Sequence, residues 1–263
     1  MHSESESSLE EDPSASLLRN TAMEAQAEHA KFKRYKTIYS IMTVLGLVLI
    51  VLTFIWSSNY AGGYSLSSPN TEFNWHPLLM VTGMVFLYSQ SILIYRTNRN
   101  VSKFKVKCIH AGLHIVILIL ASIALKAVFD SHNFANPPIA NLYTLHSWLG
   151  ILTFSLFCFQ LVLGFGTFLY PGAAKNIRAA VLPYHVIIGS AGFVMSIVTA
   201  ALGYTEKAMF TLSSNYQNLP FSAVMLNFIG LVLVIFGAIT IYLVNDRSYK
   251  REEIIEDEVA LAE

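Results

Sequence analysis

Residues 145–169, LHSWLGILTFSLFCFQLVLGFGTFL, decide the fold. The stretch begins with Leu145 and His146 and carries no lysine, arginine, aspartate or glutamate over its whole length. About 20 apolar residues in a helix span the hydrocarbon of a bilayer. Only a helix or a closed barrel satisfies every peptide group in lipid. The stretch therefore predicts a transmembrane helix.

Five further stretches have the same character. The chain has 263 residues, 54% of them hydrophobic and only 13% charged, with a mean hydropathy of +0.51. This composition is more apolar than that of a typical soluble domain. We predict an all-α membrane protein with six transmembrane helices, in which the second to fifth helices form a four-helix bundle. The predicted spans are residues 37–57, 76–96, 108–129, 145–169, 182–203 and 221–244.

The basic residues predict the orientation. All but two of the 17 lysines and arginines fall on one side of the six spans, and an excess of lysine and arginine marks the cytosolic side. Both termini should therefore be cytosolic. We expect a disordered Ser- and Glu-rich tail over residues 1–35, a membrane domain over 36–245 and a second cytosolic tail over 246–263. The basic face suits lipid headgroups or a small anion, and nothing implies nucleic acid.

A histidine lies near the beginning of each of four consecutive spans. These histidines are His76, His110, His146 and His185. Successive helices cross a bilayer in opposite directions, so His76 and His146 share the non-cytosolic face while His110 and His185 share the cytosolic face. Ionisable residues within membrane spans are usually functional. The pattern predicts two ligand sites at two depths.

A haem iron fits two histidines better than zinc does. Zinc requires four ligands, whereas haem supplies four nitrogens itself and needs only axial ligands from the protein. Gly150 and Gly189 follow His146 and His185 by one turn, and Gly83 follows His76 by two, which leaves room for a flat ring on the ligand faces. Glycines also ease helix packing in membranes. A histidine-lined transporter for protons or divalent metal, without haem, stays open as the alternative.

Two more histidines have open roles. His114 lies one turn from His110 on the same helix face, so either residue is a possible ligand. The depth of His185 favours His110. His132 belongs to the segment DSHNFANPP, which we interpret as a short polar loop near His146. Cys108 and Cys158 fall in different spans and indicate neither a disulfide framework nor a thiolate metal site.

Four motifs around the histidines resemble those of the cytochrome b561 family, the ascorbate-dependent transmembrane di-haem oxidoreductases. The resemblance extends over about residues 37–245. It implies two haem b per chain, one held by His76 with His146 and the other by His110 with His185. It also implies a homodimer. The motifs are FNWHPLLMVTG, IHAGLH, ANLYTLHSWLG and LPYHVIIGSAG.

The resemblance also assigns substrate residues. Lys103, Lys107 and Arg178 match basic residues that bind cytosolic ascorbate in the family, and Arg96 is expected to serve a haem propionate. A basic cluster attracts the ascorbate anion.

On the other face, His132, Asn141 and Tyr143 are the expected acceptor site for monodehydroascorbate or a ferric chelate. We therefore expect electron transfer from cytosolic ascorbate to a non-cytosolic acceptor. The membrane is that of a secretory vesicle, an endo-lysosome or the cell surface.

Overall fold

The computed structural model describes residues 13–251, and within that range every regular element is helical. Six helices are long and apolar enough to cross a membrane, which confirms the predicted fold class. The second span is continuous through a π-helical middle segment, η1. The elements are α1 (Pro13–Tyr60), α2 (Pro69–Glu72), α3 (Trp75–Met80), η1 (Val81–Leu87), α4 (Tyr88–Thr97), α5 (Lys103–Asn133), α6 (Leu145–Gly164), η2 (Phe165–Leu169), α7 (Lys175–Leu212), η3 (Ser213–Asn218), α8 (Phe221–Asn245) and η4 (Arg247–Tyr249).

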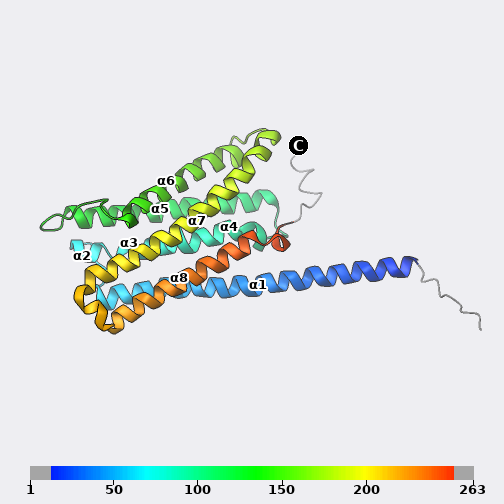
Figure 1. Ribbon diagram of the computed structural model, residues 1–263. Coiled ribbons are helices and arrows are strands. Elements are labelled where there is room, and N and C mark those ends of the chain that lie inside the picture. The colour runs from blue at the N-terminus through cyan, green and yellow to red at the C-terminus, as the bar shows by residue number, and fades with distance from the viewer. Residues whose placement is uncertain (1–12, 252–263) are drawn as a thin grey trace, which may run out of the picture.

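The six spans form one elongated bundle (Figure 1). The second to fifth spans carry the four histidines, and α1 and α8 pack together along one side of them. The loops after α4 and η2 lie at the same end of the bundle as the end of α8, which is the basic end. The starts of α3 and α6 lie at the opposite end, where the loops carry few basic residues.

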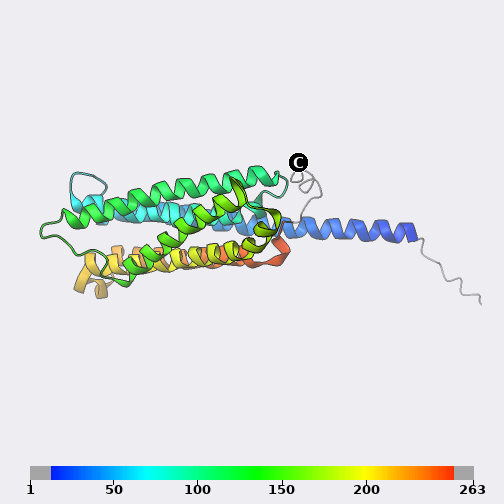
Figure 2. The same ribbon diagram turned by 90° about the horizontal axis from the view of Figure 1, so that it is seen from above.

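The first helix begins much earlier than expected. Residues 13–35 continue α1 as a helix, so the prediction of a disordered tail is wrong for this segment, while residues 1–12 lie outside the described residues. Pro13 suits the first turn of a helix. The residues from 14 to 45 include no further proline or glycine and many alanines, glutamates and lysines, which favour a helix. This extension projects beyond the bundle (Figure 2).

The α1–α8 contact follows a seven-residue repeat. Tyr35, Met42, Leu49 and Trp56 of α1 are at most 2% exposed, and a repeat of seven keeps one stripe of a helix facing its neighbour. Gly46 allows close approach, because a Cβ there would lie 2.8 Å from the Phe236 ring of α8 and 2.5 Å from the Phe86 ring of η1. On α8 the buried stripe has the matching spacing. It comprises Ser222, Leu226, Ile229, Leu233, Phe236, Thr240 and Leu243.

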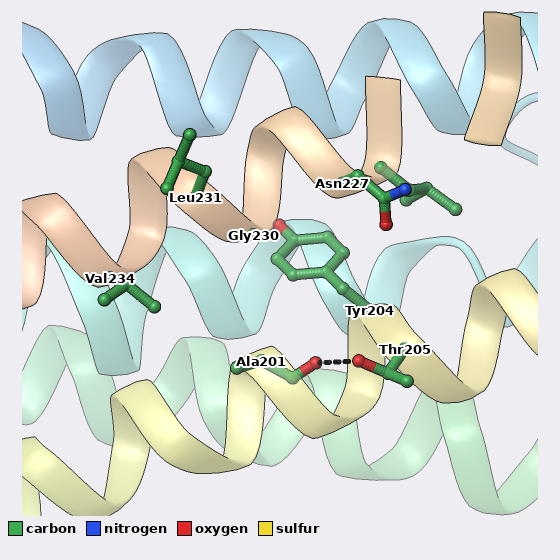
Figure 3. Close-up of a pocket in the computed structure, with 8 residues that line it drawn as sticks. Ala201, Tyr204, Thr205, Asn227, Gly230, Leu231 and Val234 are labelled. Carbon is green, nitrogen blue, oxygen red and sulfur yellow. Dashed lines mark hydrogen bonds between the residues drawn. The ribbon is translucent and has the colours of Figure 1, made fainter. Parts of the chain in front are cut away.

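The outward faces of the spans are apolar. Ile123, Val162 and Leu231 are between 50% and 74% exposed, as expected for side chains that contact lipid. A cavity of about 340 Å³ opens between α7 and α8, lined among others by Ala201, Tyr204 and Asn227 (Figure 3). No histidine lines it, so it is separate from the histidine pairs.

Candidate functional site

The pair at the starts of α3 and α6 consists of His76 and His146. Their ring centres are 6.1 Å apart and the rings are nearly perpendicular, at 87°. His76 Nδ1 lies 3.1 Å from the carbonyl oxygen of Ala124 on α5, and His146 Nδ1 lies 2.9 Å from that of Thr199 on α7. A carbonyl oxygen can only accept a hydrogen bond, so each Nδ1 is the donor and carries the proton. Nε2 of both rings is therefore left with its lone pair available for a metal.

The second pair, near the starts of α5 and α7 at the basic end of the bundle, consists of His110 and His185. Their ring centres are 6.3 Å apart at an interplanar angle of 70°. His110 Nδ1 lies 3.0 Å from the carbonyl oxygen of Ser91 on α4 and so donates to it. His185 Nδ1 has no hydrogen-bond partner within residues 13–251, and its ring packs 5.3 Å from that of Phe168. Three of the four imidazoles are thus fixed by backbone carbonyls from a neighbouring helix.

Both pairs have the spacing of two axial ligands. A first-row metal binds an imidazole nitrogen at about 2.0–2.1 Å, and the ring centre lies about 1.1 Å beyond, so opposed imidazoles have centres about 6.3 Å apart. The observed 6.1 and 6.3 Å fit this value. Between residues 13 and 251, no three His, Cys, Asp or Glu side chains are grouped to hold a metal ion. Two imidazoles per site suit haem, which brings its own equatorial nitrogens.

Two glycines make room for the ligand rings. A Cβ at Gly203 on α7 would lie 2.7 Å from His146 Cε1, and a Cβ at Gly164 on α6 would lie 2.9 Å from His185 Cε1. The arrangement is reciprocal, because the histidine of each helix rests on the glycine of the other. In both helices about five turns, or roughly 27 Å of rise, separate the histidine from the glycine. The two pairs therefore lie near opposite ends of the bundle.

These two glycines were not among the predicted ones. Gly83 packs against α5, where a Cβ would lie 3.4 Å from Leu120, and a Cβ at Gly150 would lie 3.5 Å from Thr199. Of the three predicted glycines, only Gly189, one turn beyond His185, has no atom of the described chain within 4 Å of an added Cβ. Spacing within one helix identifies glycines on the ligand's own face. It cannot identify a glycine on the helix opposite.

His114 is buried beside His110. Its ring centre lies 4.5 Å from that of His110, and the rings of Tyr88 and Phe157 lie 5.4 and 5.3 Å away. His114 Nδ1 lacks a hydrogen-bond partner within the described residues. His110 has a backbone anchor, and it is the ring that pairs with His185 at a centre-to-centre distance of 6.3 Å. The second observation supports His110 as the ligand, and the choice stays a prediction.

The three residues that are predicted to bind ascorbate lie at the basic end of the bundle. Lys103 is the first residue of α5, and Arg178 lies in the first turn of α7. Lys107 lies close enough to both for their charges to interact. The N-termini of α5 and α7 add their positive partial charges to the same region. The result is an anion-attracting face next to the His110/His185 pair.

Arg96 has a different partner from the one expected. Its Nη1 donates to the carbonyl oxygen of Asp246 at 2.5 Å, and its Nη2 donates to that of Val244. The last carbonyls of a helix have no partners within the helix, so Arg96 caps the C-terminus of α8. A role at a haem propionate stays a prediction that these contacts do not support.

Two of the three residues that are predicted to form the acceptor site lie close together in the structure. His132 Nδ1 lies 3.0 Å from Asn141 Oδ1, and Asn141 Nδ2 donates to Asn133 Oδ1 at 2.8 Å. His132 lies within electrostatic range of His76. Tyr143 is 57% exposed and has no contact with His132 or Asn141 among those in the described chain.

His132 itself lies in the last turn of α5, which ends at Asn133. The prediction that it belongs to a loop is therefore wrong. The helix breakers of the segment, Pro137 and Pro138, come only after that turn.

Comparison with known proteins places this geometry in a family. Residues 75–211 match the model of the eukaryotic cytochrome b561 family. The pig (Sus scrofa) transmembrane ascorbate-dependent reductase CYB561 is 41% identical over 208 residues, which cover 79% of this chain and 81% of the relative. The human (Homo sapiens) protein of the same name is 39% identical over 82% of this chain and 84% of its own length. The plasma membrane ascorbate-dependent reductase CYBRD1 of Xenopus laevis is 39% identical over 79% of this chain and 74% of its own length.

Proposed function

This chain belongs to the eukaryotic cytochrome b561 family, and we propose that it carries electrons across a membrane from cytosolic ascorbate to a one-electron acceptor on the other side. It is an ascorbate-dependent transmembrane reductase, in keeping with the names of its relatives, and membership of the family implies haem. The number of haems, their ligands and the acceptor are the content of the proposal.

We assign two haem b per chain, one to His76 with His146 and one to His110 with His185. The observation that carries this assignment is the pair of ring-centre distances, 6.1 and 6.3 Å. When bound, the haems supply the one-electron redox chemistry. The chain fixes each imidazole through a carbonyl on a neighbouring helix or through close packing, and Gly164 and Gly203 admit the rings.

The donor site consists of Lys103, Lys107 and Arg178. Ascorbate is a monoanion at neutral pH, and three cations at two helix N-termini attract it and hold its oxygens by charge-assisted hydrogen bonds. The site lies at the cytosolic end of the bundle, next to His110 and His185. Salt should weaken the attraction because these charges lie at the surface.

The acceptor site consists of His132, Asn141 and Tyr143. Monodehydroascorbate takes up one electron and one proton when it becomes ascorbate, whereas a ferric chelate takes up only the electron. Donation of the His132 Nδ1 proton to Asn141 Oδ1 leaves Nε2 to exchange a proton with the acceptor or to contact a chelate. The exposed Tyr143 phenol offers a further hydrogen bond. Both monodehydroascorbate and a ferric chelate are proposed acceptors.

The setting is a cell-surface, secretory-vesicle or endo-lysosomal membrane with both termini in the cytosol. Resemblance to the family further suggests a homodimer. The roles given to the residues above require this orientation, but they do not depend on which of these membranes holds the protein or on the homodimer.

Reconstituted vesicles test the proposal. Purified holoprotein is inserted into liposomes loaded with ascorbate, and reduction of an external ferric chelate or of monodehydroascorbate is followed. We expect external reduction that depends on internal ascorbate. His132→Ala should slow reoxidation by the acceptor and leave reduction by ascorbate normal. Haem that is reduced by internal ascorbate while no external acceptor is reduced would contradict transmembrane transfer.

A further inference from the structure

Lys207 lies at the outer edge of the non-cytosolic histidine pair. It follows Gly203 by one turn on the same face of α7, and Gly203 is the residue against which the His146 ring rests. Lys207 Nζ lies 4.2 Å from the centre of the Phe73 ring. The Phe73 ring lies 6.0 Å from that of His76. Lys207 is thus separated from His76 by the Phe73 ring and lies one turn beyond the residue on which His146 packs, towards the end of the bundle that is expected to face away from the cytosol.

The ammonium group of Lys207 has no carboxylate partner in the described part of the chain. The adjacent Glu206 is directed elsewhere, since its Oε2 accepts a hydrogen bond of 3.2 Å from Thr144 Oγ1 at the start of α6. The other lysine on this face, Lys126, is 72% exposed at its side chain and already paired with Asp130. Lys207 is only partly exposed, and a cation that is partly removed from water without a counter-ion loses solvation free energy. Its one described contact is the face of Phe73, which attracts a cation only modestly.

We propose that Lys207 binds an anionic oxygen group at the outer edge of the His76/His146 site. This inference rests on the proposed function, which places a haem between those histidines. The anion is either a propionate of that haem or an oxyanion of the acceptor when it docks there. In both cases the bound anion supplies the negative counter-charge that the chain's own carboxylates do not provide, and it lies beside the histidine pair from which the electron leaves. Lys207 is a positioning residue if the anion is the propionate and a binding residue if it is the acceptor.

The test compares Lys207→Gln, Lys207→Arg and the control Lys126→Gln as holoproteins. Redox titration by absorption spectroscopy gives the midpoint potential of each haem. Stopped-flow mixing of the reduced protein with ferric citrate and with an uncharged one-electron acceptor gives the reoxidation rates. Wild-type protein that binds haem and is reduced by ascorbate shows that the proposed function holds whatever the Lys207 variants do.

If the anion is a haem propionate, Lys207→Gln should lower the midpoint potential of one haem only. Loss of the cation disfavours the more electron-rich ferrous state. Lys207→Arg should restore the potential. If the anion belongs to the acceptor, Lys207→Gln should leave both midpoint potentials unchanged. The concentration of ferric citrate that gives half of the maximal reoxidation rate should rise roughly ten-fold, while reoxidation by the uncharged acceptor stays normal. The proposal is overturned if Lys207→Gln changes neither a haem midpoint potential nor the rate of reoxidation by ferric citrate, or if Lys126→Gln produces the same changes.

Discussion

Replacement of Gly203 by alanine should remove one haem and spare the other. The new Cβ would lie 2.7 Å from His146 Cε1 and 3.0 Å from its Nδ1. Non-bonded carbon atoms rest about 3.5–4.0 Å apart, so the ring must retreat by about 0.8 Å or more. The hydrogen bond from Nδ1 to Thr199 resists that movement. Metal–ligand distances vary by only about 0.2 Å, so His146 cannot retain its bond to the iron.

The reciprocal change, Gly164→Ala, should displace His185 in the same way, because its Cβ would lie 2.9 Å from that ring. Gly112→Ala is the matched control. It lies two residues from His110 on an exposed face, and no atom within the described chain lies within 4 Å of its added Cβ. Alanine favours a helix over glycine by about 1 kcal/mol, so loss of helix stability cannot explain a loss of haem.

Haem-to-protein ratios of the purified variants provide the assay. Gly203→Ala and Gly164→Ala should each retain half of the wild-type haem, and Gly112→Ala should retain all of it. The haem left in Gly203→Ala should still be reduced rapidly by ascorbate, whereas that left in Gly164→Ala should be reduced slowly. Full haem content in Gly203→Ala, or equal losses in all three variants, would refute the reasoning.

Three further predictions concern the cytosolic half of the molecule. His110→Ala should abolish the cytosolic haem spectrum while His114→Ala leaves both haems, and the reverse result would transfer the ligand role to His114. Lys107→Ala should slow reduction by ascorbate roughly ten-fold at low ionic strength but not reduction by an uncharged reductant, as stopped-flow absorption would show; equal slowing by both reductants would assign it a structural role. Arg96→Gln should lower the free energy of unfolding by about 1–3 kcal/mol, because the last carbonyls of α8 lose their hydrogen-bond donor, and it should lower the melting temperature in detergent. A changed haem content in that variant would instead support a propionate role.

The sequence predicts the six spans and their bundle because both depend on local properties. Length and apolarity identify each helix, and alternation of direction places His76 with His146 and His110 with His185. In the structure the ring centres of these two pairs lie 6.1 and 6.3 Å apart, and their role as haem ligands stays a prediction. The helical start of α1 was missed because a polar composition was interpreted as disorder, although the same residues are good helix formers.

Contacts between distant segments could not be predicted in this way. Arg96 caps the end of α8 at Asp246, far along the chain. The sequence around Arg96 shows only a basic residue at a membrane boundary. Gly164 and Gly203 matter because each faces a histidine of the other helix. The position of Lys207 over Phe73 likewise depends on how α7 meets the start of the second span.

The haem content of the purified wild-type chain, measured together with its reduction by ascorbate, tests the central claim most directly. The assignment of His76 with His146 and His110 with His185 predicts a b-type spectrum with two haems per chain, both reduced by ascorbate. A single haem per chain would contradict the paired sites. A colourless protein that transports zinc or protons would replace the electron-transfer account with a histidine-lined transporter.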